Sequence, residues 1–205
     1  LGKDIGVTQK TAWFILHRIR EMLKAKAPYM LNSTVEIDET YVGGKEKNKH
    51  KSVRKNISGY TDKTMVFAIL ERNGNVWTKM VDKVDGETLK PIIKERVDKS
   101  TTVITDGFGA YYGLDKDYHH EIINHNQDEY VRGEYHTNTI EGFFGQLKRG
   151  IYGIYHSVSP KHLHRYCSEF EFRYNTRTSK EVNRFDYSFL NCNRRLRYSD
   201  LTKSN

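Results

Sequence analysis

The stretch VEIDETYVGG, residues 35–44, alternates apolar with polar side chains and then ends in two glycines. Such alternation predicts a β-strand with one buried face. Asp38 lies in the middle of this strand, on the face opposite Ile37. Because aspartate is disfavoured in strands, its presence here favours a functional role over an ordinary solvent-facing one. Glu36 shares the face of Asp38 and is the competing candidate for that role.

Residues further along the chain predict two more strands and a helix. An apolar run over residues 65–70 suits a central strand, and Asn73-Gly74 predicts a hairpin turn into a strand over residues 76–81. A helix that begins at Asp85 follows, with apolar residues at helical spacing. The first three strands are therefore expected to form an antiparallel meander that leads into a helix.

Strands and helices then alternate. Residues 101–105 predict a fourth strand that ends at Asp106, and residues 121–124 predict a short fifth strand. Residues 139–151 and 161–174 predict two further helices. A meander, a crossover helix and parallel strands make the ribonuclease H-like arrangement, an α/β fold with a mixed sheet flanked by helices.

The first 28 residues predict a turn followed by a long basic helix. Thr8 is a good N-cap, apolar residues recur at helical spacing, and Pro28 ends the segment. With Lys10 and Arg18 on the helix, the segment is similar to the second half of a helix-turn-helix; a plain amphipathic packing helix is the alternative. We therefore expect a partial helix-turn-helix DNA-binding segment at 1–28, a ribonuclease H-like domain at 34–178 and a basic C-terminal tail at 179–205.

Charge and cysteine content narrow the class of protein. Lys and Arg number 34 against 26 Asp and Glu, a formal net charge of +8, which favours a polyanionic partner such as nucleic acid. No apolar run approaches the roughly 20 residues of a membrane span. Two cysteines are too few for a disulfide framework or a four-ligand zinc site, so we expect a cytoplasmic protein without a membrane partner. One run of basic residues indicates either a solvated loop or a segment that binds phosphates. Its cationic side chains include Lys45, Lys47, Lys49, Lys51 and Arg54.

Three acids fall where this fold brings its elements together. Asp106 ends the fourth strand, where open α/β sheets bind their ligands, and Glu141 lies on the helix that follows. Carboxylates gathered around Asp38 repel one another, and a divalent cation relieves that repulsion. Each of the later acids also has an explanation without a cation. Asp106 suits a turn, and Glu141 completes a capping box if Asn138 is the N-cap.

Lys148 follows Glu141 by seven residues, which is two helical turns, and therefore lies on nearly the same face. A cation there can hold a phosphate beside bound metal ions, and Arg149 adds a second positive charge. The alternative is a surface lysine that the helix dipole favours near a C-terminus. The histidines have irregular spacing and no nearby cysteine pair, so we expect them in loops or around the site rather than in a zinc site.

Three segments carry a family resemblance: EIDETYVGGK at 36–45, ITDGFGAY at 104–111, and HTNTIEGFFGQLKRGIYGIYHSVSPKHLHRYCSEFEFRYN at 136–175. They resemble the catalytic domain of bacterial insertion-sequence transposases of the ISXO-like group, over roughly residues 1–178. Members of that family also carry a zinc ribbon and a helix-turn-helix ahead of the catalytic domain. This sequence starts at Leu1 without the ribbon's cysteines, so we expect a segment upstream of it.

The resemblance implies a DNA transposase that catalyses divalent-metal-dependent phosphoryl transfer. It implies that Asp38, Asp106 and Glu141 are the catalytic Asp-Asp-Glu triad, that they hold Mg²⁺ or Mn²⁺ as two ions, and that Asp38 bridges the pair. It also implies that Lys148 and the basic run grip phosphates, with Asn138 as a helper. The expected partners are the element's terminal repeats, target DNA and further copies of the chain.

Two other classes of function are consistent with the same residues. One is a ribonuclease H-like nuclease that hydrolyses nucleic acid without strand transfer. The other is a domesticated DNA-binding protein without catalysis, against which the intact triad argues.

Overall fold

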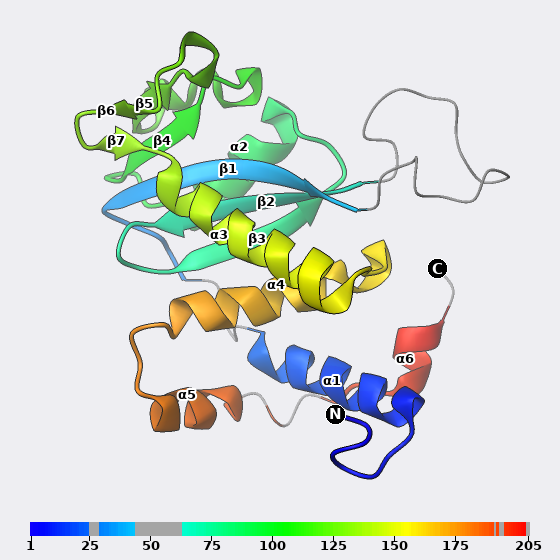
Figure 1. Ribbon diagram of the computed structural model, residues 1–205. Helices are drawn as coiled ribbons and strands as arrows, with labels where there is room; N and C mark the ends of the chain where they lie inside the picture. The colour runs from blue at the N-terminus through cyan, green and yellow to red at the C-terminus, as the bar shows by residue number, and fades with distance from the viewer. Residues whose placement is uncertain (25–28, 44–62, 191, 193–194, 204–205) are drawn as a thin grey trace, which may run out of the picture. The chain divides into compact units, whose positions relative to one another are not determined.

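A computed structural model of the chain describes residues 1–24, 29–43, 63–190, 192 and 195–203. The chain divides into two compact units, which are treated separately (Figure 1). The sheet unit is Pro28–Pro160, and the helical unit combines Leu1–Ala27 with Lys161–Asn205. Among the described residues, no helix is both long enough and apolar enough to cross a membrane.

The sheet unit contains the mixed five-stranded sheet that the sequence predicts. Its strands lie in the order β3-β2-β1-β4-β5 (Figure 1). The pairs β1/β2 and β2/β3 are antiparallel, whereas β1/β4 and β4/β5 are parallel. A three-stranded meander followed by parallel strands confirms the ribonuclease H-like fold. The bounds are β1 (Thr34–Val42), β2 (Thr64–Glu71), β3 (Val76–Val81), β4 (Thr102–Asp106) and β5 (His119–Ile123).

Helices cover both faces of this sheet (Figure 1). Helix α2 (Gly86–Arg96) is the crossover between β3 and β4, and Asp85 caps it as predicted by accepting a hydrogen bond from the Thr88 amide at 2.8 Å. Helix α3 (Asn138–Arg149) lies across the opposite face and continues into a π-helix, Gly150–Tyr155. A two-stranded sheet of β6 (Val131–Arg132) and β7 (Tyr135–His136), which the sequence pattern does not predict, precedes α3.

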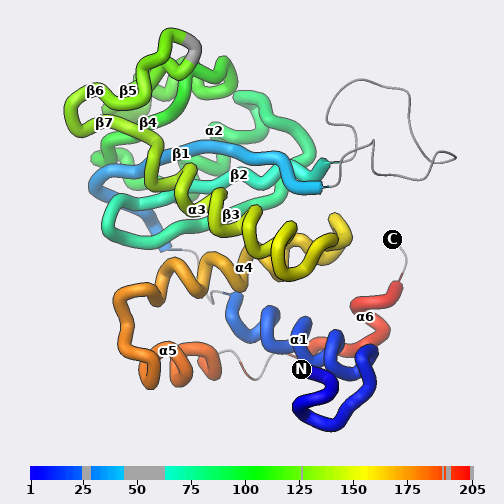
Figure 2. The backbone as a smooth tube through the Cα atoms, viewed as in Figure 1, coloured from blue at the N-terminus to red at the C-terminus, as the bar shows by residue number. Residues whose placement is uncertain are grey.

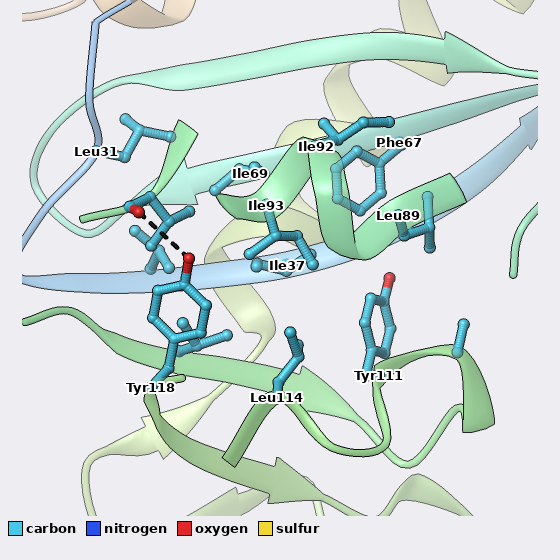
Figure 3. Close-up of a cluster of buried hydrophobic side chains, with 14 of the residues drawn as sticks. Leu31, Ile37, Phe67, Ile69, Leu89, Ile92, Ile93, Tyr111, Leu114 and Tyr118 are labelled. Atoms are coloured by element: carbon cyan, nitrogen blue, oxygen red, sulfur yellow. Dashed lines mark hydrogen bonds between the residues drawn. The ribbon is translucent and has the colours of Figure 1, made fainter. Parts of the chain in front are cut away.

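The main core lies between the sheet and α2 (Figure 3). Side chains from β1 and β2 interlock there with the buried face of α2, and Tyr118 closes one end by donating a hydrogen bond from its hydroxyl to the Val97 carbonyl at 3.3 Å. Because Ile37 points into this core, its neighbours along β1 point toward α3. The side chains in this core include Leu31, Ile37, Phe67, Ile69, Leu89, Ile93, Tyr111 and Leu114.

The helical unit joins the two ends of the described chain (Figure 2). Its helices are α1 (Gln9–Leu23), α4 (Pro160–Asn175), α5 (Glu181–Ser188) and α6 (Tyr198–Thr202). Thr8 caps α1 as predicted, and α1 ends at Leu23, ahead of the expected stop at Pro28.

A buried ion pair ties α1 to α4. The Arg20 guanidinium donates from Nε to Glu169 Oε2 at 2.8 Å, and the Trp13 ring lies 5.5 Å from the His162 ring. Residues 161–178, expected in the ribonuclease H-like domain, therefore cluster with the N-terminal helix, because their partners lie there. Helices α5 and α6 occupy the segment expected as a tail.

Candidate active site

The first two acids end up side by side because of strand pairing. Ile37 on β1 pairs with Thr105 on β4, and Asp38 and Asp106 are the residues that follow each of them. Parallel neighbours in register share a face, so both carboxylates lie on the α3 side of the sheet. On the other side, Asp38 pairs with Ala68 of β2, whose small side chain leaves room beside the carboxylate.

Glu141 reaches the same side of the sheet from the first turn of α3. Its Oε1 accepts a hydrogen bond from the Thr137 hydroxyl at 3.1 Å and lies 3.8 Å from His125 Nε2. The N-cap of α3 is Thr137, so the condition for the alternative capping box, an N-cap at Asn138, is not met. Glu141 makes no capping box, because its carboxylate bonds to a side-chain hydroxyl and not to the backbone amide of the cap. Its side chain is half exposed, which leaves it accessible to a ligand.

Burial and like charge act together on the carboxyl groups of Asp38 and Asp106. Burial raises the pKa of Asp38 to about 8; the charge of Glu39 adds to the rise, as do Asp106 and Glu141 more weakly. The pKa of Asp106 is also raised by burial and by Glu141, against the lowering effects of the Phe108 amide and His125. Negative charge gathered in a partly buried place is the condition that a bound cation relieves.

The donor atoms suit a hard divalent cation. Asp38 Oδ1 accepts from the Glu39 amide at 2.7 Å, and Asp106 Oδ1 accepts from the Phe108 amide at 3.0 Å. Within the described ranges the Oδ2 atom of each aspartate accepts no hydrogen bond, which leaves one oxygen on each for a ligand. Carboxylate oxygens are the ligands that Mg²⁺ takes in proteins. In the part of the chain that the structure describes, however, no three His, Cys, Asp or Glu side chains are placed so that together they could hold a metal ion.

The structure bears on two alternatives that the sequence left open, a turn at Asp106 and a ligand role for Glu36. Asp106 does form a turn, since its carboxylate accepts from the amide two residues on, so turn chemistry and a ligand role use different oxygens of one side chain. Glu36, the competitor of Asp38, is fully buried, and both of its carboxylate oxygens accept hydrogen bonds. Asp38 is therefore the better ligand of the two.

The basic residues expected at the site fall into three places. On α3, Lys148 is half buried in the last turn, whereas Asn138 and Arg149 are exposed at the two ends of the helix. On α1, in the helical unit, Lys10 and Arg18 are exposed. The other expected phosphate-binding residues lie outside the described residues: Lys45, Lys47, Lys49, Lys51 and Arg54.

Side chains that sequence reasoning did not select surround the acids. Glu39 accepts a hydrogen bond at 2.5 Å from the hydroxyl of Tyr111, and burial raises the pKa of both groups. His125 contacts Thr137 at 3.1 Å and so helps to hold the hydroxyl that binds Glu141. The three acids in EIDE were visible in the sequence, but nothing in the pattern marked Tyr111 as the neighbour of Glu39 or Thr137 as the neighbour of Glu141.

Solved structures with some similarity to this chain include two viral assemblies. The integrase catalytic core domain of HTLV-2 in complex with magnesium, in a trimeric form, aligns with a TM-score of 0.41 at 12% identity, over 79% of this chain and 99% of that one. A chain of the simian T-cell lymphotropic virus intasome in complex with the PP2A regulatory subunit B56 gamma aligns with a TM-score of 0.40 at 14% identity, over 80% of this chain and 61% of that one.

Curated relatives come from transposable elements. The chain is 30% identical over 185 residues to an uncharacterised protein in the transposable element ISH50 of Halobacterium salinarum, an alignment that covers 84% of this chain and 62% of the relative. It is 33% identical over 101 residues to an uncharacterised transposase-like protein of Haemophilus influenzae, over 49% of this chain and 80% of the relative. The chain thus spans less than two thirds of the Halobacterium relative's length.

The family comparison covers most of the sheet unit and continues into α4. The family model of the ISXO2-like transposase domain matches residues 30–175, a range that contains all three acids and Lys148. This agrees with the resemblance drawn from the EIDETYVGGK, ITDGFGAY and HTNTIEG segments. The chain belongs to the ISXO2-like transposase family.

Proposed function

We propose that this chain is the catalytic part of a DNA transposase that cleaves the ends of an insertion sequence and joins them to target DNA. The observation that carries the proposal is the placement of Asp38 and Asp106 on adjacent strands, with Glu141 within electrostatic reach of both. Membership of a transposase family supports it.

The three acids are proposed to hold divalent cations, Mg²⁺ or Mn²⁺, as two ions. Cations in such a site activate the attacking oxygen and stabilise the leaving oxygen of a phosphodiester. The chain's own contribution is to keep Asp38 and Asp106 fixed on a rigid sheet, each with one oxygen tied to a backbone amide and the other directed to the ligand. Glu141 is oriented from α3 by the Thr137 hydroxyl.

The proposed reaction has two displacements at phosphorus. A water oxygen first attacks the phosphodiester at the element's end, and the 3′ oxygen leaves and takes up a proton. The freed 3′-hydroxyl then loses its proton to solvent and attacks a target phosphodiester, from which another 3′ oxygen leaves. One phosphodiester is broken and one formed in the second step, so no external energy source is required.

Basic residues are proposed to bind the DNA backbone. Lys148 and Arg149 lie on the helix that carries Glu141, so a phosphate held there would lie beside the acids. Within the described ranges neither side chain forms an ion pair, which leaves both charges available. Lys10 and Arg18 are proposed to contact DNA from α1, and the active form is proposed to be a multimer that pairs two ends.

Strand transfer by the full chain tests the proposal. Labelled DNA carrying the element's ends is incubated with a target plasmid and Mg²⁺ or Mn²⁺. We expect joined product from the unmodified protein, and Asp38→Asn is expected to abolish joining while leaving DNA binding largely intact. Asp82→Asn serves as the matched control, because Asp82 is an exposed aspartate outside the site.

The outcomes separate the candidate functions. Strand transfer retained in Asp38→Asn would overturn the assignment of the site. Metal-dependent cleavage without joined product would identify a nuclease in place of a transposase. DNA binding without any metal-dependent cleavage by the full chain would identify a non-catalytic DNA-binding protein.

A further inference from the structure

Glu36 is a carboxylate with no exposed surface, two residues before Asp38 on the same face of β1. Burial of a carboxylate costs several kcal/mol unless a cation and hydrogen-bond donors satisfy it. The environment of Glu36 therefore has to supply these partners, and where they come from indicates what the residue does.

Three donors satisfy the two oxygens of Glu36. Oε1 accepts from Arg72 Nε and from the Thr139 hydroxyl, each at 2.8 Å. Oε2 accepts from the backbone amide of Ile140 at 2.9 Å. His136 Nδ1 also approaches Oε1, at 3.5 Å. Both oxygens are occupied, so Glu36 is not placed as a metal ligand.

The amide of Ile140 belongs to the first turn of α3. The first amides of a helix have no partner within the helix, and the side chain of the N-cap residue usually accepts one of them. The N-cap of α3, Thr137, makes no such bond with its side chain. Glu36 takes over this role from 104 positions away, and its negative charge suits the positive end of the helix dipole.

Arg72 also connects Glu36 to the segment that precedes α3, because its guanidinium hydrogen-bonds to both. While Nε binds Glu36, Nη1 donates to the Glu134 carbonyl at 2.5 Å and Nη2 donates to the His136 carbonyl at 2.9 Å. One guanidinium therefore connects β1 with Glu134, just before β7, and with His136, the last residue of β7. The planar fork of arginine suits this task, which a lysine cannot reproduce.

We propose that Glu36, with Arg72 and Thr139, is a positioning residue that sets where Glu141 stands relative to Asp38. The inference rests on the proposed function, in which these two acids hold cations. Glu36 is two residues from Asp38 along β1, and the amide that it binds directly precedes Glu141. The hydrogen bond thus joins β1 and α3 two residues from Asp38 and one residue from Glu141.

The test uses the full chain and three variants. Glu36→Gln keeps the shape but replaces one acceptor oxygen by a donor, so either Arg72 and Thr139 together or the Ile140 amide lose their acceptor. Thr139→Val removes one bond without changing the volume much, and Thr139→Ser restores the hydroxyl. Glu169→Gln is the matched control, because Glu169 is another buried carboxylate paired with an arginine, in the helical unit.

Two readouts do not depend on catalysis. Mn²⁺ alone is titrated and the free ion followed by electron paramagnetic resonance, and amide hydrogen exchange is measured in the first turn of α3. We expect Glu36→Gln to weaken Mn²⁺ affinity about 10–100-fold, as loss of outer-shell partners does at metal sites, and to speed exchange in that turn. Thr139→Val should show a smaller change of the same kind, Thr139→Ser should recover, and Glu169→Gln should leave both readouts unchanged.

The results distinguish this inference from the proposed function. Unchanged exchange and unchanged Mn²⁺ affinity in Glu36→Gln would overturn the positioning role. If Glu36→Gln does not fold, the Thr139 pair decides: equal Mn²⁺ affinity in Thr139→Val and Thr139→Ser would also overturn it. If the unmodified chain binds Mn²⁺ but joins no DNA, the proposed function fails, whereas the expected shifts in the variants still support the positioning role.

Discussion

At the scale of single residues, Asp38 combines burial with a negatively charged neighbour. Burial raises its pKa to about 8, and the charge of Glu39 adds to this rise. In the metal-free protein Asp38 is therefore mostly protonated at neutral pH. The proposed cation can bind the carboxylate only after that proton has left, so we expect its binding to release a proton and to tighten as the pH rises.

The raised pKa predicts how Asp38→Asn changes stability. Below the ordinary pKa of 3.8 the side chain is protonated in the folded and unfolded chain alike, and folding is not penalised. Between pH 3.8 and about 8 the unfolded chain ionises more readily, so the wild type loses stability as the pH rises. Asparagine does not ionise. We expect the variant to melt several degrees above the wild type at pH 8, with a gap that closes toward pH 4.

Thermal unfolding in the presence of a chelator at pH 4, 6 and 8 checks this prediction. Asp82→Asn, at an exposed position, is expected to show no pH-dependent difference of this size. A gap for Asp38→Asn that stays constant between pH 4 and pH 8 would contradict the raised pKa.

At the scale of elements, α3 has two different faces. One face is fully buried in the sheet unit through Ile140, Phe143 and Leu147. The other carries Gly142 and Gly145, and a Cβ atom built at either glycine meets no atom within 4 Å. Glycine inside a helix is less stable than alanine, and no contact in the described structure requires glycine at these two positions.

Gly145→Ala is therefore expected to stabilise the protein by about 0.5–1 kcal/mol. The reason is the smaller backbone entropy of alanine in the unfolded chain, together with the open space at this site. Gly113→Ala is the contrasting variant, because Gly113 has a φ of 85° that alanine adopts only with strain. It should destabilise by about 1–2 kcal/mol. Chemical denaturation of the three proteins measures both values, and a loss of stability in Gly145→Ala would show that the open space does not exist in solution.

Local patterns predicted the elements of the sheet unit well. Strand β1 was predictable because alternation reports one buried face, and that same alternation placed Asp38 opposite Ile37 correctly. The sequence could not predict that Glu36 is fully hydrogen-bonded whereas Asp38 keeps a free oxygen, because both lie on one face of β1. Only the hydrogen bonds from Arg72 and α3 to Glu36 distinguish them. The cap of α3 could not be decided from the sequence for a related reason. Thr137 and Asn138 are both good caps by type, and the bond from Ile140 to a distant strand decides between them.

Helix α5 was not predicted, although Val182 and Phe185 recur at helical spacing. With 8 residues the helix is short, and so short a periodic segment is weak evidence for a helix. Val182 and Phe185 are 72% and 65% exposed, and no described residue of the helix is buried.

At the scale of the whole molecule, the two ends of the chain meet in one unit. Arg20 and Glu169 are 149 positions apart, yet their side chains form a buried pair with 4% and 8% exposure. No local pattern reports such a pairing, which is why the sequence assigned α1 to an N-terminal segment and α4 to the ribonuclease H-like domain. The carboxylate of Glu169 also binds Arg173, whose side chain is 60% exposed.

These two arginines offer a matched comparison. Arg20→Met is expected to destabilise the helical unit by about 3–5 kcal/mol, because it leaves a buried carboxylate without its buried cation. Arg173→Met removes an exposed partner of the same carboxylate and should cost at most about 1 kcal/mol. Hydrogen exchange of α1 amides measures the change in this unit directly. Equal effects of the two substitutions would contradict the burial of the Arg20 pair.

The bond between Glu36 and the Ile140 amide also bears on when the proposed site is completed during synthesis of the chain. It joins residues 104 positions apart, and closing a loop of that length opposes folding through lost chain entropy. A growing chain emerges from its N-terminus, so Asp38 and Asp106 exist long before α3 does. We therefore expect an incomplete chain to carry two acids without the third, and the proposed cleavage activity to arise only after nearly the entire sheet unit has been made.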